Sequence, residues 1–375
     1  MHVVITGANG FIGRNLRQHL SEREGFEVSL VTRETSEEEL QAALRKANFV
    51  FHLAGVNRPQ NVSEFKEGNT DLTVKISQLL AARVRETGEK VPLVVTSSTQ
   101  VAVENDYGIS KRNGEIAAQK AASDAGFPLH IFRLPNVFGK WARPDYNSAV
   151  ATFCHNIARC KPIQVNNPDA EITLVYVDDV VNRFLQLLDG AQPNQNAEGF
   201  EQVQPQYKIT VGALADTLRA FKASRESLVT ERVGQGLIRA LHSTYVSFLP
   251  PEEFAYSVPM HGDARGVFVE MLKTPDCGQF SYFTAHPGIT RGGHYHHSKT
   301  EKFLVIKGQA RFKFREIQTG EEYELVTDGA EAKIVETVPG WTHDITNIGD
   351  DEMVVMLWAN EIFDRENPDT FACPL

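Results

Sequence analysis

Two groups of residues in this chain combine types and spacings that can do chemistry. In the first, Tyr107 and Lys111 are four residues apart, which places a phenol and an ammonium one turn apart on one helix face. They follow the β-rich run 94–98, which ends in the hydroxyl of Ser98. A phenol can protonate a ketone oxygen as hydride arrives, an ammonium lowers the pKa of that phenol, and a serine orients the carbonyl. The spacing predicts ketone reduction, with an ordinary surface pair as the alternative.

The second group lies near the other end and consists of His294, His296, Glu301 and His343. On a strand, the side chains of His294 and His296 point to the same face, because strand side chains alternate with a period of two. Glu301 and His343 can complete a cage of three nitrogens and one oxygen from neighbouring strands. Such a set suits zinc, iron, manganese or nickel. We expect one divalent metal, with zinc as the first choice.

A glycine-rich turn opens the chain. Residues 7–13 follow an expected strand at 3–6 and precede a helix-compatible segment. Glycines there permit a tight turn and a close approach of backbone N–H groups to a pyrophosphate. The spacing GxxGxxG in this context predicts dinucleotide binding, with contacts from Gly7, Asn9, Gly10, Phe11, Ile12 and Gly13.

The second expected strand ends in Val31-Thr32-Arg33. An acidic residue at this place would bond the ribose hydroxyls of NAD, whereas Arg33 suits the 2′-phosphate of NADP. We therefore predict NADPH as the cofactor. A solvated arginine at a loop entry is the alternative.

Two patterns of elements position these residues. In residues 1–246, short β-rich runs alternate with amphipathic helical segments, which predicts a Rossmann-like, doubly wound parallel sheet. Pro250-Pro251 breaks this pattern. Residues 247–375 then show short alternating strands between Gly, Pro and Asp turns, which predicts an all-β barrel or jelly roll. The expected strands of this part are 267–272, 279–284, 302–306, 310–315, 323–326, 332–336 and 353–358.

Composition excludes several classes of protein. The formal charge of −10 argues against a nucleic-acid surface, because phosphate contacts need clustered Lys and Arg. No apolar run approaches the roughly 20 residues of a membrane span. The first strand begins directly after Met1, which leaves no room for a signal peptide, and the four cysteines show no CxxC spacing. We expect a cytoplasmic protein without membrane or nucleic-acid partners.

The first domain resembles the extended short-chain dehydrogenase/reductase family, whose members largely act on nucleotide sugars. Beyond the motifs above, the resemblance lies in residues 52–55, His-Leu-Ala-Gly, in residues 133–139, and in residues 176–179, Tyr-Val-Asp-Asp. It implies cofactor contacts from Leu53, Ala54 and Gly55, with Tyr107 and Lys111 also at the nicotinamide ribose. It further implies a sugar-nucleotide pocket lined by Asn136, Lys140, Arg143 and Asn147.

The second domain resembles the cupins, on residues 293–296, Glu301, Gly308, residues 339–343 and Asn347. It is also similar to the metal-free deoxysugar epimerases of that superfamily, on residues 263–270, Gln279 and 291–294. In those enzymes the histidine after Arg-Gly-x removes a proton next to a ketone. His294 cannot be both a metal ligand and a free base, so the base is another group or a metal-bound water if metal is present. A purely structural metal is a further alternative.

Arg265 and Arg291 belong to the epimerase-like motifs. They are predicted to bind the substrate diphosphate or an enolate, with structural ion pairs as the alternative. In domain order and motifs, the whole chain resembles the CapF/WbjC-type enzymes of bacterial capsule and O-antigen synthesis. The resemblance implies a UDP-4-keto-6-deoxy-N-acetylhexosamine substrate, epimerised at C3 by the cupin and reduced at C4 by the first domain. The expected product is UDP-2-acetamido-2,6-dideoxy-L-talose, and the expected assembly is a homodimer.

Two other functions compete with this interpretation. One is an NADPH-dependent nucleotide-sugar reductase whose cupin serves only dimerisation. The other is a non-enzymatic, NADP-responsive sugar sensor. Ser98, Tyr107 and Lys111 argue against the sensor, because a sensor has no use for a proton donor beside the nicotinamide.

Overall fold

The computed structural model describes residues 1–259, 261–263, 266–268, 272, 278–361 and 366–375. Contacts divide the chain into two compact units. The first unit comprises Met1–Ser148 and Ile172–Lys208, and the second comprises Ala149–Glu171 and Ile209–Leu375. The functional boundary expected between residues 246 and 247 stays a prediction.

A five-stranded parallel sheet forms the centre of the first unit, in the order β2-β1-β3-β4-β5. Its strands are β1 His2–Thr6, β2 Glu27–Val31, β3 Phe49–His52, β4 Leu93–Ser98 and β5 Leu129–Leu134. β1 and β3 are buried along their whole length, which explains why they read as nearly continuous apolar runs. The predicted Rossmann-like parallel sheet is confirmed.

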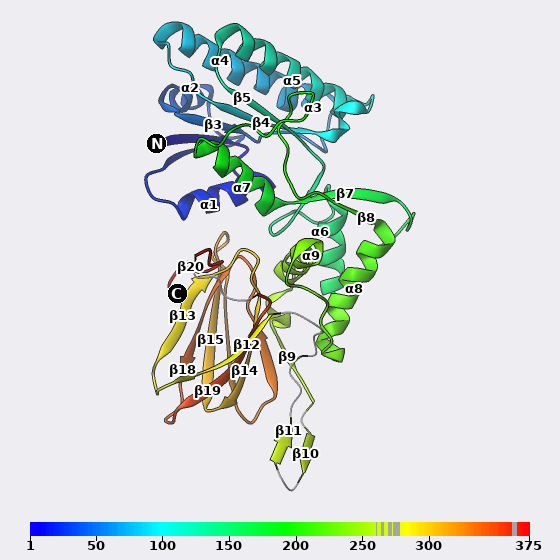
Figure 1. Ribbon diagram of the computed structural model, residues 1–375, viewed down its shortest axis with the longest axis vertical. Helices are drawn as coiled ribbons and strands as arrows, with labels where there is room; N and C mark the ends of the chain where they lie inside the picture. Colours follow the sequence, from blue (N-terminus) through cyan, green and yellow to red (C-terminus); the bar gives the residue numbers. More distant parts are fainter. Residues whose placement is uncertain (260, 264–265, 269–271, 273–277, 362–365) are drawn as a thin grey trace. The chain divides into compact units, whose positions relative to one another are not determined.

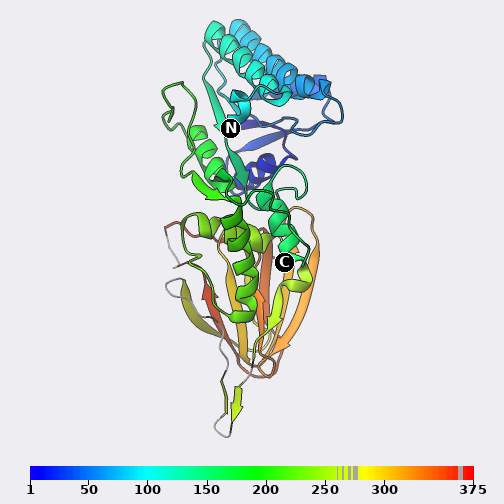
Figure 2. The same cartoon turned by 90° about the vertical axis from the view of Figure 1, so that its right-hand side faces the viewer.

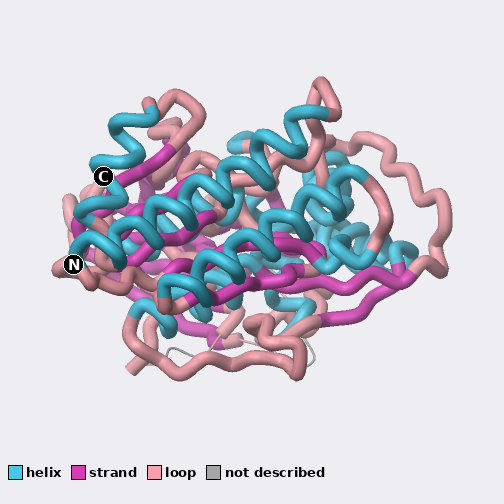
Figure 3. Tube along the Cα trace, turned by 90° about the horizontal axis from the view of Figure 1, so that it is seen from above, coloured by secondary structure: helices cyan, strands magenta, loops and turns pink. Residues whose placement is uncertain are grey.

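Helices cover both faces of this sheet (Figure 1). On one face lie α2 Glu37–Lys46, α4 Leu72–Thr87 and α5 Asp106–Ala125, and on the other lie α1 Phe11–Ser21 and α7 Val177–Leu188. Figure 3 shows the long helices running across the strands. Ile76, Leu80 and Ala118 from α4 and α5 are fully or almost fully buried in a core with Val50 and Val95 of the sheet. Burial of these apolar side chains drives the layering.

Several shorter elements lie outside the central sheet. β6 Asn136–Phe138, β7 Glu171–Tyr176 and β8 Tyr207–Thr210 form a three-stranded sheet. Before α4, the helix α3 Ser63–Phe65 continues into a π-helical turn at Lys66–Asp71. A 3₁₀ turn at Thr99–Ala102 follows β4. Both turns lie where the predicted reductase residues come together.

Two five-stranded antiparallel sheets dominate the second unit, in the orders β12-β19-β14-β17-β9 and β16-β15-β18-β13-β20. The first consists of β9 Ala255–Ser257, β12 Gln279–Ala285, β14 Glu301–Lys307, β17 Lys333–Glu336 and β19 Met353–Ala359. The second consists of β13 Thr290–Tyr295, β15 Gln309–Glu316, β16 Glu322–Asp328, β18 Trp341–Asn347 and β20 Phe371–Ala372. Phe303 of one sheet lies 5.7 Å, between ring centroids, from Phe312 of the other. The sheets thus face each other across an aromatic core (Figure 2).

Helices α6 Ala149–Ala158, α8 Val211–Ser227 and α9 Gly236–Ser247 also belong to the second unit, together with the 3₁₀ turn Pro251–Glu253. A short hairpin of β10 His261–Asp263 and β11 Gly266–Phe268 stands apart from the two sheets. The expected all-β region is confirmed as antiparallel, and β13 and β18, which carry histidines, add to the expected strands. Residues 269–271 of the strand expected at 267–272 lie outside the described residues. Among the described helices, none has the length and apolar character to cross a membrane.

Candidate functional site

The glycine turn between β1 and α1 packs closely against the chain's own backbone and leaves no room for side chains. Gly7 has a φ of +68°, and a Cβ there would lie 2.6 Å from the Ala54 nitrogen. A Cβ on Gly13 would lie 2.3 Å from the Gly7 oxygen. Gly10 precedes α1 without a side-chain cap, so the first N–H groups of α1 are free for an anion. This cradle fits the pyrophosphate of a dinucleotide.

A buried histidine holds the segment that faces the glycine turn. His52 Nδ1 lies 2.7 Å from the Thr6 hydroxyl, and His52 Nε2 lies 2.8 Å from the Thr73 hydroxyl. Thr73 donates to the Asn69 carbonyl, so it accepts from His52 Nε2–H. The Ala54 N–H donates to the Thr6 hydroxyl. Burial and the nearby Lys111 charge lower the pKa of His52 to about 3, so it is a neutral positioning group for residues 53–55.

Ser98, Tyr107 and Lys111 come together as predicted. Ser98 ends β4, and Tyr107 lies near the start of α5, close enough for the Ser98 hydroxyl to affect the pKa of the phenol. Lys111, one turn further along α5, donates from Nζ to the Thr96 carbonyl at 3.2 Å. A Cβ on Gly55 would lie 2.8 Å from Lys111 Nζ. Residues 53–55, called the cofactor loop below, and the predicted catalytic residues therefore lie together at the carboxyl edge of the sheet.

The pKa of Tyr107 is shifted in the direction opposite to the one expected from the sequence. Burial raises the pKa of Tyr107, the neighbouring Ser98 hydroxyl opposes this, and Tyr146 adds to the rise. The pKa of Tyr107 is therefore raised, whereas a lowering by Lys111 was expected. Burial also lowers the pKa of Lys111 to about 8, against the opposing charge of Glu115. At neutral pH the phenol carries its proton and can act as an acid.

Asn69 is a member of this site that the sequence did not indicate. It lies in the π-helical turn, where its amide donates to the Ser110 hydroxyl at 3.0 Å and to the Val56 carbonyl, and accepts from the Val56 N–H. Asn69 Oδ1 would be 3.1 Å from a Cβ on Gly55. It thus links the cofactor loop to α5. Only a π-helical turn, which is often found at functional sites, signals its role, and no sequence pattern marks such a turn.

Positive and aromatic side chains lie near Tyr107 as well. The guanidinium carbons of Arg143 and Arg58 lie 5.2 and 5.9 Å from the Tyr146 ring centroid. Both arginines are exposed. Arg143 was predicted as a substrate contact, whereas Arg58 and Tyr146 were not. Cations over an aromatic ring leave their N–H groups available to an anion.

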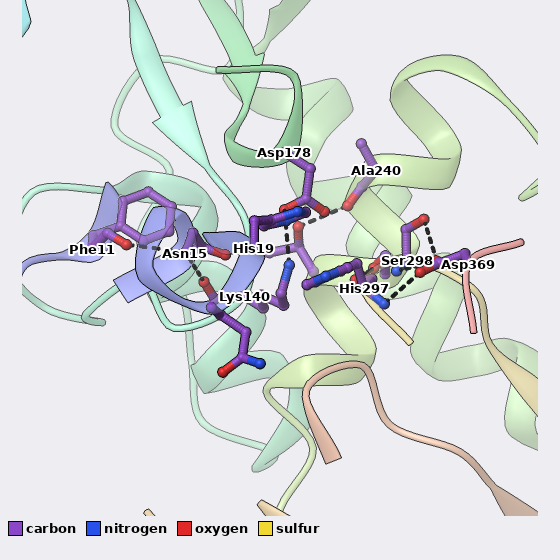
Figure 4. Close-up of polar contacts among 12 residues, drawn as sticks. Phe11, Asn15, His19, Lys140, Asp178, Ala240, His297, Ser298 and Asp369 are labelled. Atoms are coloured by element: carbon purple, nitrogen blue, oxygen red, sulfur yellow. Dashed lines mark hydrogen bonds and ion pairs between the residues drawn. The ribbon is translucent and has the colours of Figure 1, made fainter. Parts of the chain in front are cut away.

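The remaining predicted cofactor and substrate contacts of the first unit differ in their exposure and in their hydrogen-bond and ion-pair partners. Arg33 lies just after β2, is exposed, and forms no ion pair within the part of the chain that the structure describes. Asn136 is exposed and donates to the Thr173 carbonyl at 3.1 Å. Asn147 is exposed. Lys140 is fully buried, and its ammonium lies 2.8 Å from the Asp178 carboxylate (Figure 4). A substrate contact by Lys140 therefore requires this ion pair to open.

The four predicted metal ligands of the second unit converge. One ligand atom from each of His294, His296, Glu301 and His343 lies within 4.8 Å of the others. His296 Nε2 lies 3.1 Å from Glu301 Oε2, and His343 Nε2 lies 3.6 Å from the same oxygen. His294 is half-buried and the other three are buried. His343 Nε2 has no hydrogen-bond partner among the described residues although it is buried, as a metal-binding nitrogen would be.

The charges of this cluster also fit a metal. Burial and the neighbouring histidines lower the pKa of His294 to about 4. Burial likewise lowers the pKa of His343. Burial alone would raise the pKa of Glu301, but the adjacent side chains of His296 and His343 and the charge of Lys299 hold it well below its usual range. Neutral imidazoles and an ionised carboxylate are the forms that bind divalent metals, so the residues fit such an ion.

Two arginines were predicted to bind substrate in this unit. Arg291 is exposed, donates to the Thr284 carbonyl at 3.0 Å, and lies 5.0 Å from the Phe283 ring centroid. It lies on β13, three residues before His294. Arg265 lies outside the described residues.

Two family models match this chain. Residues 3–201 match the family described as NAD dependent epimerase/dehydratase, and residues 261–371 match the polysaccharide biosynthesis C-terminal domain. The chain is 63% identical over 373 residues to the UDP-2-acetamido-2,6-beta-L-arabino-hexul-4-ose reductase of Pseudomonas aeruginosa, covering 100% of this chain and 98% of that one. Among solved structures, it is similar to the capsular polysaccharide assembling protein CapF from Staphylococcus aureus. That match has 42% identity, a TM-score of 0.69 and full coverage of both chains.

A more distant match shows the fold alone. The UDP-glucuronic acid 4-epimerase from Bacillus cereus, solved in complex with NAD, is 16% identical with a TM-score of 0.50. The match covers 60% of this chain and 83% of that one.

Proposed function

This chain belongs to the NAD-dependent epimerase/dehydratase family, among its CapF/WbjC-type capsular polysaccharide enzymes, and we propose that it is a bifunctional nucleotide-sugar enzyme. Its chemistry is of the nucleotide-sugar reductase and epimerase type, with a nicotinamide cofactor. The proposed substrate is a UDP-4-keto-6-deoxy-N-acetylhexosamine. C3 epimerisation in the second unit precedes C4 reduction in the first, and the product is UDP-2-acetamido-2,6-dideoxy-L-talose. The name of the Pseudomonas relative, a reductase of a UDP-linked hexul-4-ose, supports the reduction.

The observation that carries the reductase proposal is the position of Tyr107 and Lys111, one turn apart on α5, with Ser98 beside the phenol and Gly55 beside the ammonium. NADPH, when bound, supplies the hydride that reduces C4. Tyr107 donates its phenolic proton to the ketone oxygen, and Ser98 bonds the same oxygen and orients it. Lys111 contacts the ribose and stabilises the phenolate that remains. Arg33 accounts for the proposed preference for NADPH, because its exposed guanidinium suits a 2′-phosphate.

In the second unit, we propose a cupin jelly roll whose His294, His296, Glu301 and His343 hold one divalent ion, with zinc as first choice. Such an ion polarises a ketone oxygen as a Lewis acid. The antiparallel sheets and the convergence of the four side chains support this proposal. Because all three histidines are then ligands, the group that moves the C3 proton is not one of them.

The order of the two steps follows from acidity. A proton at C3 is acidic only while C4 is a ketone, because the charge of the resulting enolate rests on oxygen. Once C4 carries a hydroxyl, no such stabilisation exists. Epimerisation therefore precedes reduction.

Further parts of the proposal concern contacts, domains and assembly. Asn136, Arg143 and Asn147 contact the sugar nucleotide, with Lys140 only if its ion pair opens, and Arg265 and Arg291 contact it in the cupin. The functional domains are residues 1–246 and 247–375. We propose a homodimer that works in the cytoplasm, where NADPH and UDP-sugars are available.

The competing function is a reductase whose second unit serves only dimerisation. We would incubate the full chain with the UDP-4-keto sugar in deuterated water, with and without NADPH. The wild-type protein and Tyr107→Phe should incorporate deuterium at C3 without NADPH, and only the wild type should oxidise NADPH. Glu301→Gln should lose the exchange, because it removes the charged ligand. If no protein exchanges C3 while NADPH is still oxidised, the epimerase proposal is wrong and the competing function stands.

A further inference from the structure

The C-terminal segment lies along the strand that carries the first predicted metal ligand. β20 pairs antiparallel with β13, so that Ala372 is opposite His294 and Phe371 is opposite Tyr295. The Cys373 N–H donates to the Gly293 carbonyl at 2.8 Å. β20 is therefore an edge strand of the sheet that carries His294 and His343, and it is tied to that sheet by main-chain bonds.

Just before β20, the Asp369 carboxylate is surrounded by donors from one short loop. Its oxygens accept from the main-chain N–H groups of His297, Ser298 and Lys299, at 2.8, 2.7 and 2.7 Å. The Ser298 hydroxyl donates to it as well, at 2.9 Å. Figure 4 shows Ser298 beside Asp369. All these donors lie between His296 and Glu301, so one carboxylate sets the shape of the loop that connects two predicted ligands.

Asp369 also contacts a predicted ligand through its main chain. His296 Nδ1 is hydrogen-bonded to the Asp369 carbonyl oxygen. A carbonyl only accepts, so Nδ1 carries a hydrogen, and in the neutral form of the ring the lone pair lies on Nε2. Nε2 is the atom that faces Glu301 Oε2 at 3.1 Å. The same residue thus selects the tautomer in which His296 can bind a metal through Nε2.

We propose that Asp369 is the positioning residue of the metal site: its carboxylate holds loop 297–299 in place and its carbonyl orients His296 Nε2 toward the ion. This inference rests on the proposed metal site of the second unit. Asp369 acts only through His296 and the loop, and it binds no metal itself. Residues that hydrogen-bond to a metal-binding histidine commonly affect metal affinity, because an imidazole without such a bond must be oriented when the ion binds.

Asp369→Asn tests the proposal with little change in volume. An amide presents N–H groups to a pocket lined by N–H donors, so at least one of the four bonds is lost and the segment shifts. We expect zinc affinity to fall about 10- to 100-fold. Ser298→Ala removes one of the four donors to Asp369, together with an acceptor for Arg239, and should weaken zinc binding less. Asp350→Asn is the matched control, because Asp350 is an exposed carboxylate in the turn between β18 and β19, and its zinc affinity should be unchanged.

The measurement uses the full chain, stripped of metal and titrated with zinc in competition with a chromogenic chelator. Cobalt absorption spectra of the same proteins report ligand geometry, and they should change for Asp369→Asn and not for Asp350→Asn. A merely structural role for Asp369 would lower the folded fraction without changing the affinity or the spectrum of the folded protein.

The possible results separate the two proposals. If the wild-type protein binds no zinc or cobalt, the proposed metal site is wrong and the role of Asp369 falls with it. If the wild type binds zinc and Asp369→Asn binds it equally well, only the role of Asp369 is overturned. Should Asp369→Asn fail to fold, Ser298→Ala decides, and unchanged zinc affinity and an unchanged cobalt spectrum in that variant would overturn the inference.

Discussion

Lys111→Met should stabilise the first unit while removing reductase activity. Lys111 is partly buried beneath the cofactor loop, and its ammonium has the Thr96 carbonyl as a hydrogen-bond acceptor at 3.2 Å. Burial lowers the pKa of Lys111 from 10.5 to about 8. Folding therefore disfavours the charged form of this lysine. Methionine fills a similar volume without the charge, so the cost of burying the ammonium disappears.

The size of the effect follows from the two pKa values of Lys111. The difference between 10.5 and about 8 corresponds to about 3 kcal/mol, at about 1.4 kcal/mol per pH unit. Because the side chain is only partly buried, solvent screening reduces this to about 2 kcal/mol. We expect Lys111→Met to raise the free energy of unfolding by that amount at pH 7. NADPH oxidation should fall about 100-fold or more, because the phenol loses its cationic partner.

The stabilisation should also depend on pH. The unfolded chain keeps the lysine proton up to about pH 10.5, whereas the folded chain releases it near pH 8. Between these values the unfolded state binds more protons, so the wild-type protein gains stability as the pH rises. The advantage of Lys111→Met is therefore complete below about pH 8 and vanishes towards pH 10.5.

The assay must separate the two units, because a chain with two compact units need not unfold in one step. We would equilibrate the protein in urea at each pH, apply a brief deuterium pulse at one fixed pH, and follow peptides from β3 to β5 by mass spectrometry. Lys120→Met is the control, since Lys120 is exposed on the same helix. No stabilisation at pH 7, a gain that does not change with pH, or an equal gain in the control would refute the reasoning.

Other predictions concern the cofactor and the metal. Tyr107→Phe should abolish NADPH oxidation but leave NADPH binding, measured by calorimetry, nearly intact; full turnover would show that another group donates the proton. Arg33→Ala should weaken NADPH binding by about 1–3 kcal/mol and NADH binding less, because a charge-assisted phosphate contact is lost; equal affinity of the wild type for both cofactors would contradict this. Gly13→Ala places a Cβ 2.3 Å from the Gly7 oxygen and should lower the free energy of unfolding of the first unit by about 1–3 kcal/mol; an unchanged urea midpoint would argue against the tight turn. Elemental analysis of protein purified without added metal should find about one transition metal per chain; a fully active metal-free protein would leave the histidine cluster without that role.

Local patterns in the sequence were sufficient to predict much of the fold and many residues of the candidate sites. The glycine turn, the Tyr107–Lys111 spacing and the alternation of strands and helices are short-range features, because turn geometry and helix and strand periods depend on neighbouring residues. They predicted the parallel sheet and brought Ser98, Tyr107 and Lys111 together correctly. The histidine cluster was predictable for a different reason: its residue types suit a metal, although its members lie as far apart in the chain as His294 and His343.

Only the tertiary structure decided what surrounds these residues. Asn69 contacts Ser110 across 41 positions, and Asp369 contacts His296 across 73. The burial of Lys140 in an ion pair with Asp178 and the raised pKa of Tyr107 likewise come from packing between distant segments. Hydrogen-bond partners, burial and the resulting shifts in pKa depend on which distant segments pack together, and no local period in the sequence encodes them. The sequence thus identified the groups that can react, and the fold decided how each one is held and charged.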